Sequence, residues 1–162
     1  MNGVTRVLGR IGALVVLGSC QQPAPKFTAQ DDAAVRGLFD STVAHIRAGK
    51  LESWAGLFAA DARFYPAHSP VLVGRPAILA WGKSLPPIDG FAFSDVAVTG
   101  EGNLAHGSSR VFLQLRGLPA DTSKQLIVAH RDSAGRWLVQ AVAVSTDLPM
   151  PSVTPPPPAR KK

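Results

Sequence analysis

The sequence predicts an α+β domain in which three helices are followed by a curved antiparallel sheet. In the first half of the chain apolar residues recur at helical spacing, whereas the second half contains short β-branched and apolar runs separated by turn residues. The links "GEGN", "LPADTS" and "DSAG" are too short to hold a crossover helix, so consecutive strands are expected to be antiparallel. Such a sheet would wrap around the longest helix and enclose a cone-shaped cavity.

The longest helix is expected over residues 29–48. Thr28 and Asp31 have the spacing of a capping box at its start, and Gly49 can end it in a left-handed conformation. Its apolar face consists of five residues at helical spacing, namely Val35, Leu38, Phe39, Val43 and Ile46. We expect the sheet to cover this face.

Two shorter helices and five strands complete the prediction. Pro76 is suited to be the first residue of a third helix that reaches Trp81. The second helix is indicated by four apolar residues at helical spacing, Leu51, Trp54, Leu57 and Phe58. The strands are expected at residues 63–65, 91–99, 108–116, 125–131 and 137–146.

The N-terminal segment has the layout of an export signal. Two arginines precede a short apolar run at residues 11–17, and two small residues come directly before Cys20, the only cysteine. This order resembles the lipobox of bacterial lipoproteins, in which the cysteine is acylated and becomes the new N-terminus. Residues 1–19 are therefore predicted to be a signal peptide, Cys20 the lipidation site, and residues 20–28 a linker.

Cys20 and the residue after it also indicate where the protein is expected in the cell. A lone cysteine in an exported protein cannot form an internal disulfide, so the alternatives to lipid attachment are a free thiol or a bridge between chains behind a simple cleavable signal. Gln21 stands where an aspartate would resemble an inner-membrane retention signal. The expected location is the periplasmic face of an outer membrane, with the membrane as a partner through lipidated Cys20.

Basic charge is concentrated at the two ends of the chain. Of the 17 Lys and Arg residues, two lie in residues 1–19 and three in the tail 149–162, which leaves twelve against all eleven acids in the domain between. This near-neutral domain has no basic stripe, which argues against nucleic acid as a partner. The tail contains four consecutive prolines at 155–158 and is predicted to be a disordered basic segment.

Three segments of the domain match a known superfamily. They are "AGKLESWAGLFAADARF", the pair Gly74-Arg75 before the third helix, and Gly135-Arg136-Trp137 before the last strand. On these segments residues 29–148 resemble the NTF2-like superfamily in its SnoaL-like and DUF4440 branch. The resemblance implies an α+β cone but no single activity, because similar cones host isomerases, cyclases, dehydratases, epoxide hydrolases and non-catalytic binding modules.

The resemblance also implies where catalytic groups would stand. In the ketosteroid-isomerase relatives, a general-base aspartate follows the strand after the second helix, a tyrosine on the first helix stabilises the oxyanion, and a protonated aspartate stands on a late strand. The aligned positions hold Pro66, Thr42 and Ile127 in this chain. The three catalytic groups are absent, so isomerisation by that mechanism is not expected.

Other residues remain candidates for chemistry or binding. Tyr65 and His68 flank a proline at the expected mouth of the cone, and His130 shares an apolar face of its strand, so that each could act as an acid or base. The competing interpretation is an exposed loop histidine, a packed tyrosine and core tryptophans. The candidate ligand-binding set is His45, Trp54, Tyr65, His68, Trp81 and His130.

Two function classes stay open. The preferred one is a lipid-anchored binding or scaffold domain that holds a small hydrophobic molecule, or forms a homodimer through its open sheet face, without catalysis. The alternative is a lyase or isomerase for a small apolar substrate, with His130 or His68 as base and Tyr65 as proton donor. A carboxylate beside a histidine on the cavity floor would favour the enzyme, and the carboxylates in question are Asp40, Asp95 and Asp147.

Metal and cofactor sites are not expected. The four histidines are scattered without metal-ligand spacing, and neither a nucleotide-binding glycine motif nor a serine-hydrolase elbow occurs.

Overall fold

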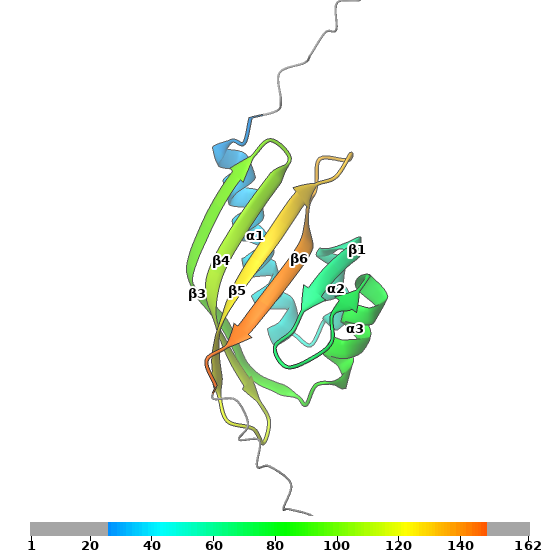
Figure 1. Cartoon of the computed structure of the whole chain (residues 1–162), viewed down its shortest axis with the longest axis vertical. Coiled ribbons are helices and arrows are strands. Elements are labelled where there is room, and N and C mark those ends of the chain that lie inside the picture. The colour runs from blue at the N-terminus through cyan, green and yellow to red at the C-terminus, as the bar shows by residue number, and fades with distance from the viewer. Residues whose placement is uncertain (1–25, 149–162) are drawn as a thin grey trace, which may run out of the picture.

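The structure, a computed structural model, describes residues 26–148 and has the predicted α+β architecture (Figure 1). The predicted signal peptide, Cys20 and the proline-rich tail lie outside these residues. The helices are α1 (Ala29–Arg47), α2 (Leu51–Gly56) and α3 (Arg75–Ser84), and none of the described helices is long and apolar enough to cross a membrane. The strands are β1 (Phe58–Tyr65), β2 (Leu72–Val73), β3 (Ile88–Glu101), β4 (Leu104–Leu115), β5 (Asp121–Arg131) and β6 (Trp137–Thr146).

The six strands form one sheet in the order β2-β1-β6-β5-β4-β3. Strands β3 to β6 are a consecutive antiparallel meander, as predicted from the short links. The sheet as a whole is mixed, because β1 pairs in parallel with β6. A parallel pair needs a long connection between its two strands. Here β2, α3 and the strands β3 to β5 all lie between β1 and β6 in the sequence and provide that connection.

The first strand is longer than the sequence predicts. Phe58, predicted to belong to the second helix, is the first residue of β1, and α2 ends two residues earlier at Gly56. The physical reason is that Phe58 pairs with Val139 of β6, a partner far away in the sequence that local helical spacing cannot reveal.

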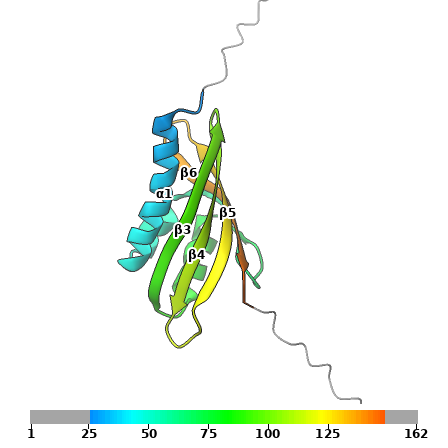
Figure 2. The ribbon, with the colours of Figure 1, turned by 90° about the vertical axis from the view of Figure 1, so that its left-hand side faces the viewer.

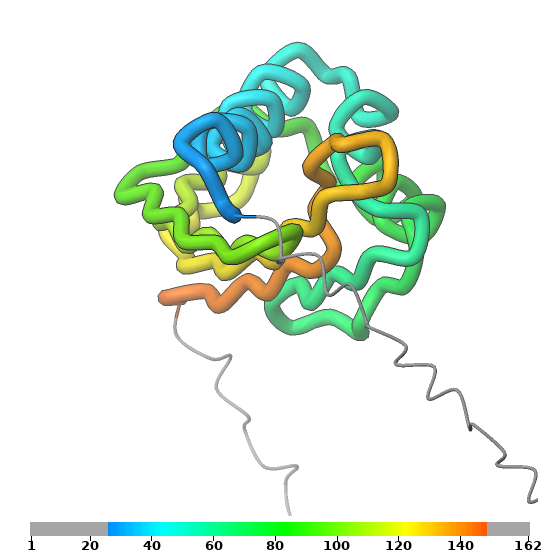
Figure 3. Tube along the Cα trace, turned by 90° about the horizontal axis from the view of Figure 1, so that it is seen from above, coloured from blue at the N-terminus to red at the C-terminus, as the bar shows by residue number. Residues whose placement is uncertain are grey.

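Helix α1 lies across the concave side of the sheet (Figures 2 and 3). The predicted capping box is present, since Thr28 Oγ1 accepts from the Asp31 main-chain N–H while the Asp31 carboxylate accepts from the Thr28 N–H at 2.9 Å. Gly49 follows the helix in the predicted left-handed conformation, with φ of 66°. The predicted stripe faces inward, and Val35 is fully buried.

Small residues on the sheet allow α1 to approach closely. A Cβ atom at Gly107 of β4 would lie only 2.8 Å from Phe39 Cζ of α1. The neighbouring inward positions Ala105 and Ala129 are also small and are buried. All three helices and strands β1, β3, β4, β5 and β6 contribute buried apolar side chains, so residues 26–148 contain a core of their own.

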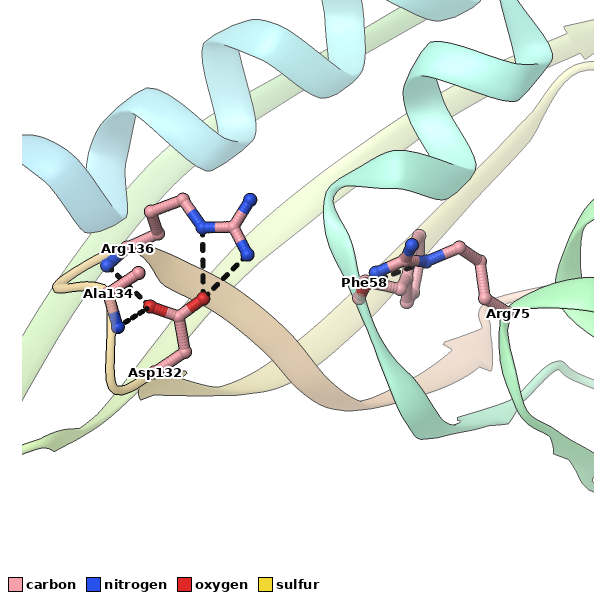
Figure 4. Close-up of polar contacts among 5 residues, drawn as sticks. All are labelled: Phe58, Arg75, Asp132, Ala134 and Arg136. Carbon is pink, nitrogen blue, oxygen red and sulfur yellow. Dashed lines mark hydrogen bonds and ion pairs between the residues drawn. The ribbon is translucent and has the colours of Figure 1, made fainter.

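The most specific segments of the superfamily resemblance have structural roles (Figure 4). The Arg75 guanidinium donates from Nε to the main-chain oxygen of Phe58 at 3.0 Å and so ties the start of α3 to the start of β1. In the turn between β5 and β6, the Asp132 carboxylate accepts from the main-chain N–H groups of Ala134 and Arg136 and from the Arg136 side chain. Both contacts hold connections of the fold.

Candidate functional site

An apolar cavity of about 320 Å³ lies between the helices and the inner face of the sheet. This volume lies at the lower end of the range of small-molecule sites. Most of its lining is aromatic and branched aliphatic, and the polar residues in the lining are Thr42, Ser69, Asp121, Ser123 and Gln125. The lining thus has the composition of a small-molecule site, an apolar surface with a few polar groups.

The cavity reaches the end of the sheet where β4 and β5 are joined. Leu115 and Asp121, the last residue of β4 and the first of β5, belong to its lining. The loop after β1 contributes Pro66 and Ser69, and the link between α3 and β3 contributes Leu85. These segments surround the lower end of the domain in Figure 1, opposite the start of α1.

The opposite end of the inner face is closed by a packed polar and aromatic cluster. The Trp137 ring meets Phe27 edge to face with centroids 5.7 Å apart, and its Nε1 donates to buried Asp31 at 3.2 Å. Arg131 forms an ion pair with Asp31 and lies 5.1 Å from the Trp137 ring centroid. Arg131 Nε has no hydrogen-bond partner among the described residues.

The three positions aligned with isomerase catalytic groups all face the cavity. Thr42, Pro66 and Ile127 belong to its lining, which is where the missing tyrosine and aspartates would have to stand. Pro66 and Ile127 carry no ionisable group, and a threonine hydroxyl does not titrate near neutral pH. The cavity lining therefore carries no ionisable side chain at these three positions.

Two of the six predicted ligand-binding residues line the cavity. Trp54 of α2 and Trp81 of α3 do so, with Trp54 buried and packed edge to face against Phe58 at 5.3 Å between centroids. His45 is half-buried on α1 but does not belong to the lining. Trp137 lies in the closed end instead.

The three candidate catalytic residues, Tyr65, His68 and His130, do not come together in the cavity. Tyr65 is 40 % exposed because strand alternation turns its neighbours Phe64 and Pro66 inward and Tyr65 outward. His68 is exposed in the following loop with φ of 55°. None of these side chains belongs to the cavity lining.

His130 lies on the outer face of the sheet, contrary to the prediction that it faces a pocket. The inward residues of β5 are Ile127 and Ala129, whereas Leu126 and His130 are exposed. Alternation along β5 was predicted correctly, but the apolar outer face was mistaken for the inner one. Both faces of β5 carry aliphatic residues, so hydrophobicity alone does not distinguish them.

The carboxylates that would have favoured an enzyme are also outside the cavity. Asp40 borders a separate groove between α1 and β3, and Asp95 occupies a bulge of β3 with φ of 54°. Asp147 forms an ion pair with Lys124, and its main-chain N–H donates to Thr122 O at 3.2 Å. No histidine belongs to the cavity lining within residues 26–148.

Four polar lining residues were missed by the sequence reasoning, namely Ser69 in the loop after β1 and three residues of β5. Asp121, Ser123 and Gln125 alternate along the first half of β5 and face inward, ahead of Ile127 on the same face. The Asp121 carboxylate accepts from Thr146 Oγ1 at 2.8 Å. The period of two along β5 was the available signal, because the superfamily alignment had already placed Ile127 of the same strand at a catalytic position of the cone.

The described residues do not contain a cluster of three or more potential metal ligands among histidine, cysteine and the acids. The chemistry that the cavity offers is therefore carried by hydroxyl, amide and one carboxylate group on an apolar wall.

No sequence-family profile and no curated protein sequence matches the chain. Solved structures do match its fold. A Mycobacterium tuberculosis protein of unknown function superposes with a TM-score of 0.67 at 19% identity, covering 78% of this chain and 84% of its own. An NTF2-like protein of unknown function from Pseudomonas putida gives 0.67 at 16% identity, covering 76% and 91%.

A ketosteroid isomerase-like protein from Erwinia carotovora is similar as well, with a TM-score of 0.65 at 12% identity over 75% of this chain and all of its own. At such low identities the likeness concerns the fold alone. The chain therefore has the NTF2-like fold, as its sequence predicts.

Proposed function

We propose that this protein is a lipid-anchored envelope protein whose NTF2-like domain binds a small hydrophobic molecule without transforming it. The observation that carries the proposal is the apolar cavity, with Thr42, Pro66 and Ile127 at the positions of the isomerase catalytic groups. Assignment to the SnoaL-like and DUF4440 branch is part of the proposal and is supported by the sequence segments quoted above.

The lining favours binding of an apolar molecule. Every 100 Å² of apolar ligand surface removed from water contributes about 2.5 kcal/mol. The aromatic side chains of the lining already pack against one another. The ring centroids of Phe91 and Phe93 lie 5.0 Å apart, edge to face, and those of Phe64 and Trp81 lie 4.9 Å apart. A packed wall of this kind does not need to rearrange when the ligand enters.

The scarcity of proton-transfer groups in the lining argues for binding without catalysis. General acid-base catalysis needs a titratable group within hydrogen-bonding reach of the reacting atom. In the described lining the one titratable side chain is Asp121, at the end of the cavity, and no second ionisable group stands opposite to complete an acid and base pair.

The proposed lipid anchor and the cavity would lie at opposite ends of the domain. Cys20 precedes Lys26, the first described residue, by only six positions, so a lipid on Cys20 would hold the α1 end of the domain near a membrane. The cavity reaches the other end of the sheet, where β4 and β5 are joined. Ligand would then enter from the aqueous side, and the expected place is the periplasmic face of an outer membrane.

The test of binding uses the chain from residue 21 onward, which keeps every described residue and omits Cys20. N-phenyl-1-naphthylamine, a neutral apolar fluorophore, should become fluorescent on saturable binding and should accept excitation energy from Trp54 and Trp81, which line the cavity. Replacing Val144, a lining residue, by Phe should abolish the signal. The matched control His130→Ala, on the outer face, should leave the affinity unchanged.

Failure of saturable binding, or equal binding by the Val144→Phe variant, would contradict the proposal. The anchor is tested separately by mass spectrometry of the protein from its own host. A diacylglycerol-sized mass on Cys20 that disappears in Cys20→Ser supports it, and an unmodified Cys20 contradicts it.

A second proposed role is pairing of two copies through the outer face of the sheet. Four large side chains on this face are exposed, Tyr65 at 40%, Phe112 at 44%, Leu126 at 49% and Leu104 at 55%. The register aligns Tyr65 and Leu126 on either side of Ala143, which makes part of this apolar surface continuous. A contiguous exposed apolar patch is typical of an interaction surface.

The pairing is tested by analytical ultracentrifugation of the chain from residue 21 onward. A dimer that becomes a monomer in the Leu126→Glu variant supports the role, with Val73→Glu as the control because Val73 is exposed on β2 at the far edge. A wild-type monomer at high micromolar concentration contradicts it.

A further inference from the structure

The inner face of β5 changes from polar to apolar along the strand. Ile127 and Ala129 are buried beneath α1, whereas Asp121, Ser123 and Gln125 precede them on the same face and line the cavity. We call these three residues the polar row. Inward side chains on one strand repeat roughly every 6.6 Å, so the row extends over roughly 13 Å from the end of the cavity towards its floor.

Much of the hydrogen-bonding capacity near this row is unused by the protein. Ser109 of β4 stands directly opposite Gln125 in the sheet, is 6 % exposed, and its Oγ has no hydrogen-bond partner among the described residues. Ser123 is 2 % exposed and lies between Val111 and Thr146 in the register. Buried polar atoms are normally satisfied, so the Ser109 hydroxyl is an exception next to the polar row, although Ser109 itself does not belong to the cavity lining.

The described part of the cavity lining carries a single charge, and it is negative. Asp121 is the one charged residue among the described lining residues, and neither lysine, arginine nor histidine belongs to that lining. Lys124, a cationic neighbour on the same strand, lies on the opposite face of β5 and forms an ion pair with Asp147. An anionic ligand would enter a low-dielectric space that offers it a carboxylate and no counter-charge.

We propose that the cavity selects apolar molecules bearing a neutral hydrogen-bonding group, such as an alcohol or phenol, and rejects carboxylates of the same shape. This inference rests on the proposed binding function and specifies its ligand class. The hydroxyl can donate to Asp121 or Gln125 and accept from Ser123 or the Gln125 amide. The hydrocarbon body then occupies the aromatic part of the cavity.

The test is displacement of N-phenyl-1-naphthylamine by three compounds of matched shape, namely 2-naphthol, naphthalene and 2-naphthoate, at neutral pH. The naphthol should bind at least roughly tenfold more tightly than the naphthoate, because a hydrogen bond contributes up to about tenfold and a buried charge without a counter-charge costs more than that. It should also bind more tightly than naphthalene, which fills the same space without using the polar row.

Variants assign the selectivity to individual residues. Asp121→Asn removes the one charge and should improve naphthoate binding roughly tenfold while changing naphthol binding by less than about threefold. Asp147→Asn changes the net charge equally on the outer face and should alter neither affinity. Gln125→Leu keeps a similar volume and should reduce the preference for naphthol over naphthalene.

The outcomes separate this inference from the binding function on which it rests. If N-phenyl-1-naphthylamine itself does not bind, the binding function is wrong. If it binds and naphthoate displaces it as well as naphthol does, the ligand class is wrong while the binding function stands. Equal displacement by naphthol and naphthalene, or an Asp121→Asn effect matched by Asp147→Asn, would also overturn the ligand class.

Discussion

The two ends of the sheet's inner face differ in how their space is filled. At the α1 start, Asp31, Arg131 and Trp137 pack against one another and close the cone with an ion pair, an indole hydrogen bond and a cation–aromatic contact. At the other end, the polar row lies beside empty space and a buried hydroxyl without a partner. The comparison teaches that one end provides stability and the other provides room for a ligand, and substitutions should separate the two.

The largest expected effect comes from Asp31→Ala in the closed end. The substitution removes the capping box, the acceptor of the Trp137 indole and the partner of Arg131, so the free energy of unfolding should fall by about 3 kcal/mol or more. Urea denaturation measures the loss. Asp32→Ala is the matched control, because Asp32 pairs with Arg36 on the surface and should cost less than about 1 kcal/mol.

A smaller loss is expected from Gly107→Ala, beneath α1. The new methyl group would meet the buried Phe39 ring at 2.8 Å and Ile127 at 3.2 Å, which should cost about 1–3 kcal/mol of unfolding free energy. Gly56→Ala is the control, since a Cβ there meets nothing within 4 Å. Equal melting temperatures of the two variants would show that the helix is not closely seated at this point.

Overpacking the open end should cost less than overpacking the closed one. Val144→Phe adds volume next to the cavity and should change the free energy of unfolding by less than about 1 kcal/mol, because the ring can occupy the empty space. Ala129→Val adds fewer atoms at a fully buried position and should cost more. A calorimetric result in the reverse order would mean that the cavity is filled by the protein itself.

The smallest expected effect is a dependence of stability on pH from the turn between β5 and β6. The Arg136 main-chain N–H, and then the Arg136 side chain, lower the pKa of Asp132 from its ordinary value. A lowered folded-state pKa stabilises the fold above the unfolded-state pKa, and the gain is lost as the pH falls through the folded-state value.

The stability difference between the wild type and Asp132→Asn should therefore be greatest near neutral pH and shrink in acid. Chemical denaturation at neutral and acidic pH measures it. A difference that stays constant across this range would contradict a role for the ionised carboxylate.

The fold could largely be predicted from the sequence, because its main determinants are local. Helical spacing with Thr28, Asp31 and Gly49 marks both ends of α1, and short links give the antiparallel meander. The parallel pairing of β1 with β6 could not be predicted, since Phe58 finds its partner Val139 only in the tertiary structure.

The candidate site was predicted less well, for a different reason. Trp54 and Trp81 were identified because large apolar side chains on short helices must be covered by something. The polar row was missed and His130 misplaced because period-two alternation gives two faces without saying which is inside, and the alignment of Ile127 with a catalytic position was not extended along the strand. Leu126 on the outer face made the wrong choice look reasonable.

The most direct test of the account is native mass spectrometry of the protein isolated from its own host. We expect the wild-type protein to carry a small molecule of constant mass, neutral and rich in hydrocarbon, and the Val144→Phe variant to carry none. Equal occupancy of both proteins, or no bound molecule in either, would contradict the view that the open end of the cone exists to hold a ligand.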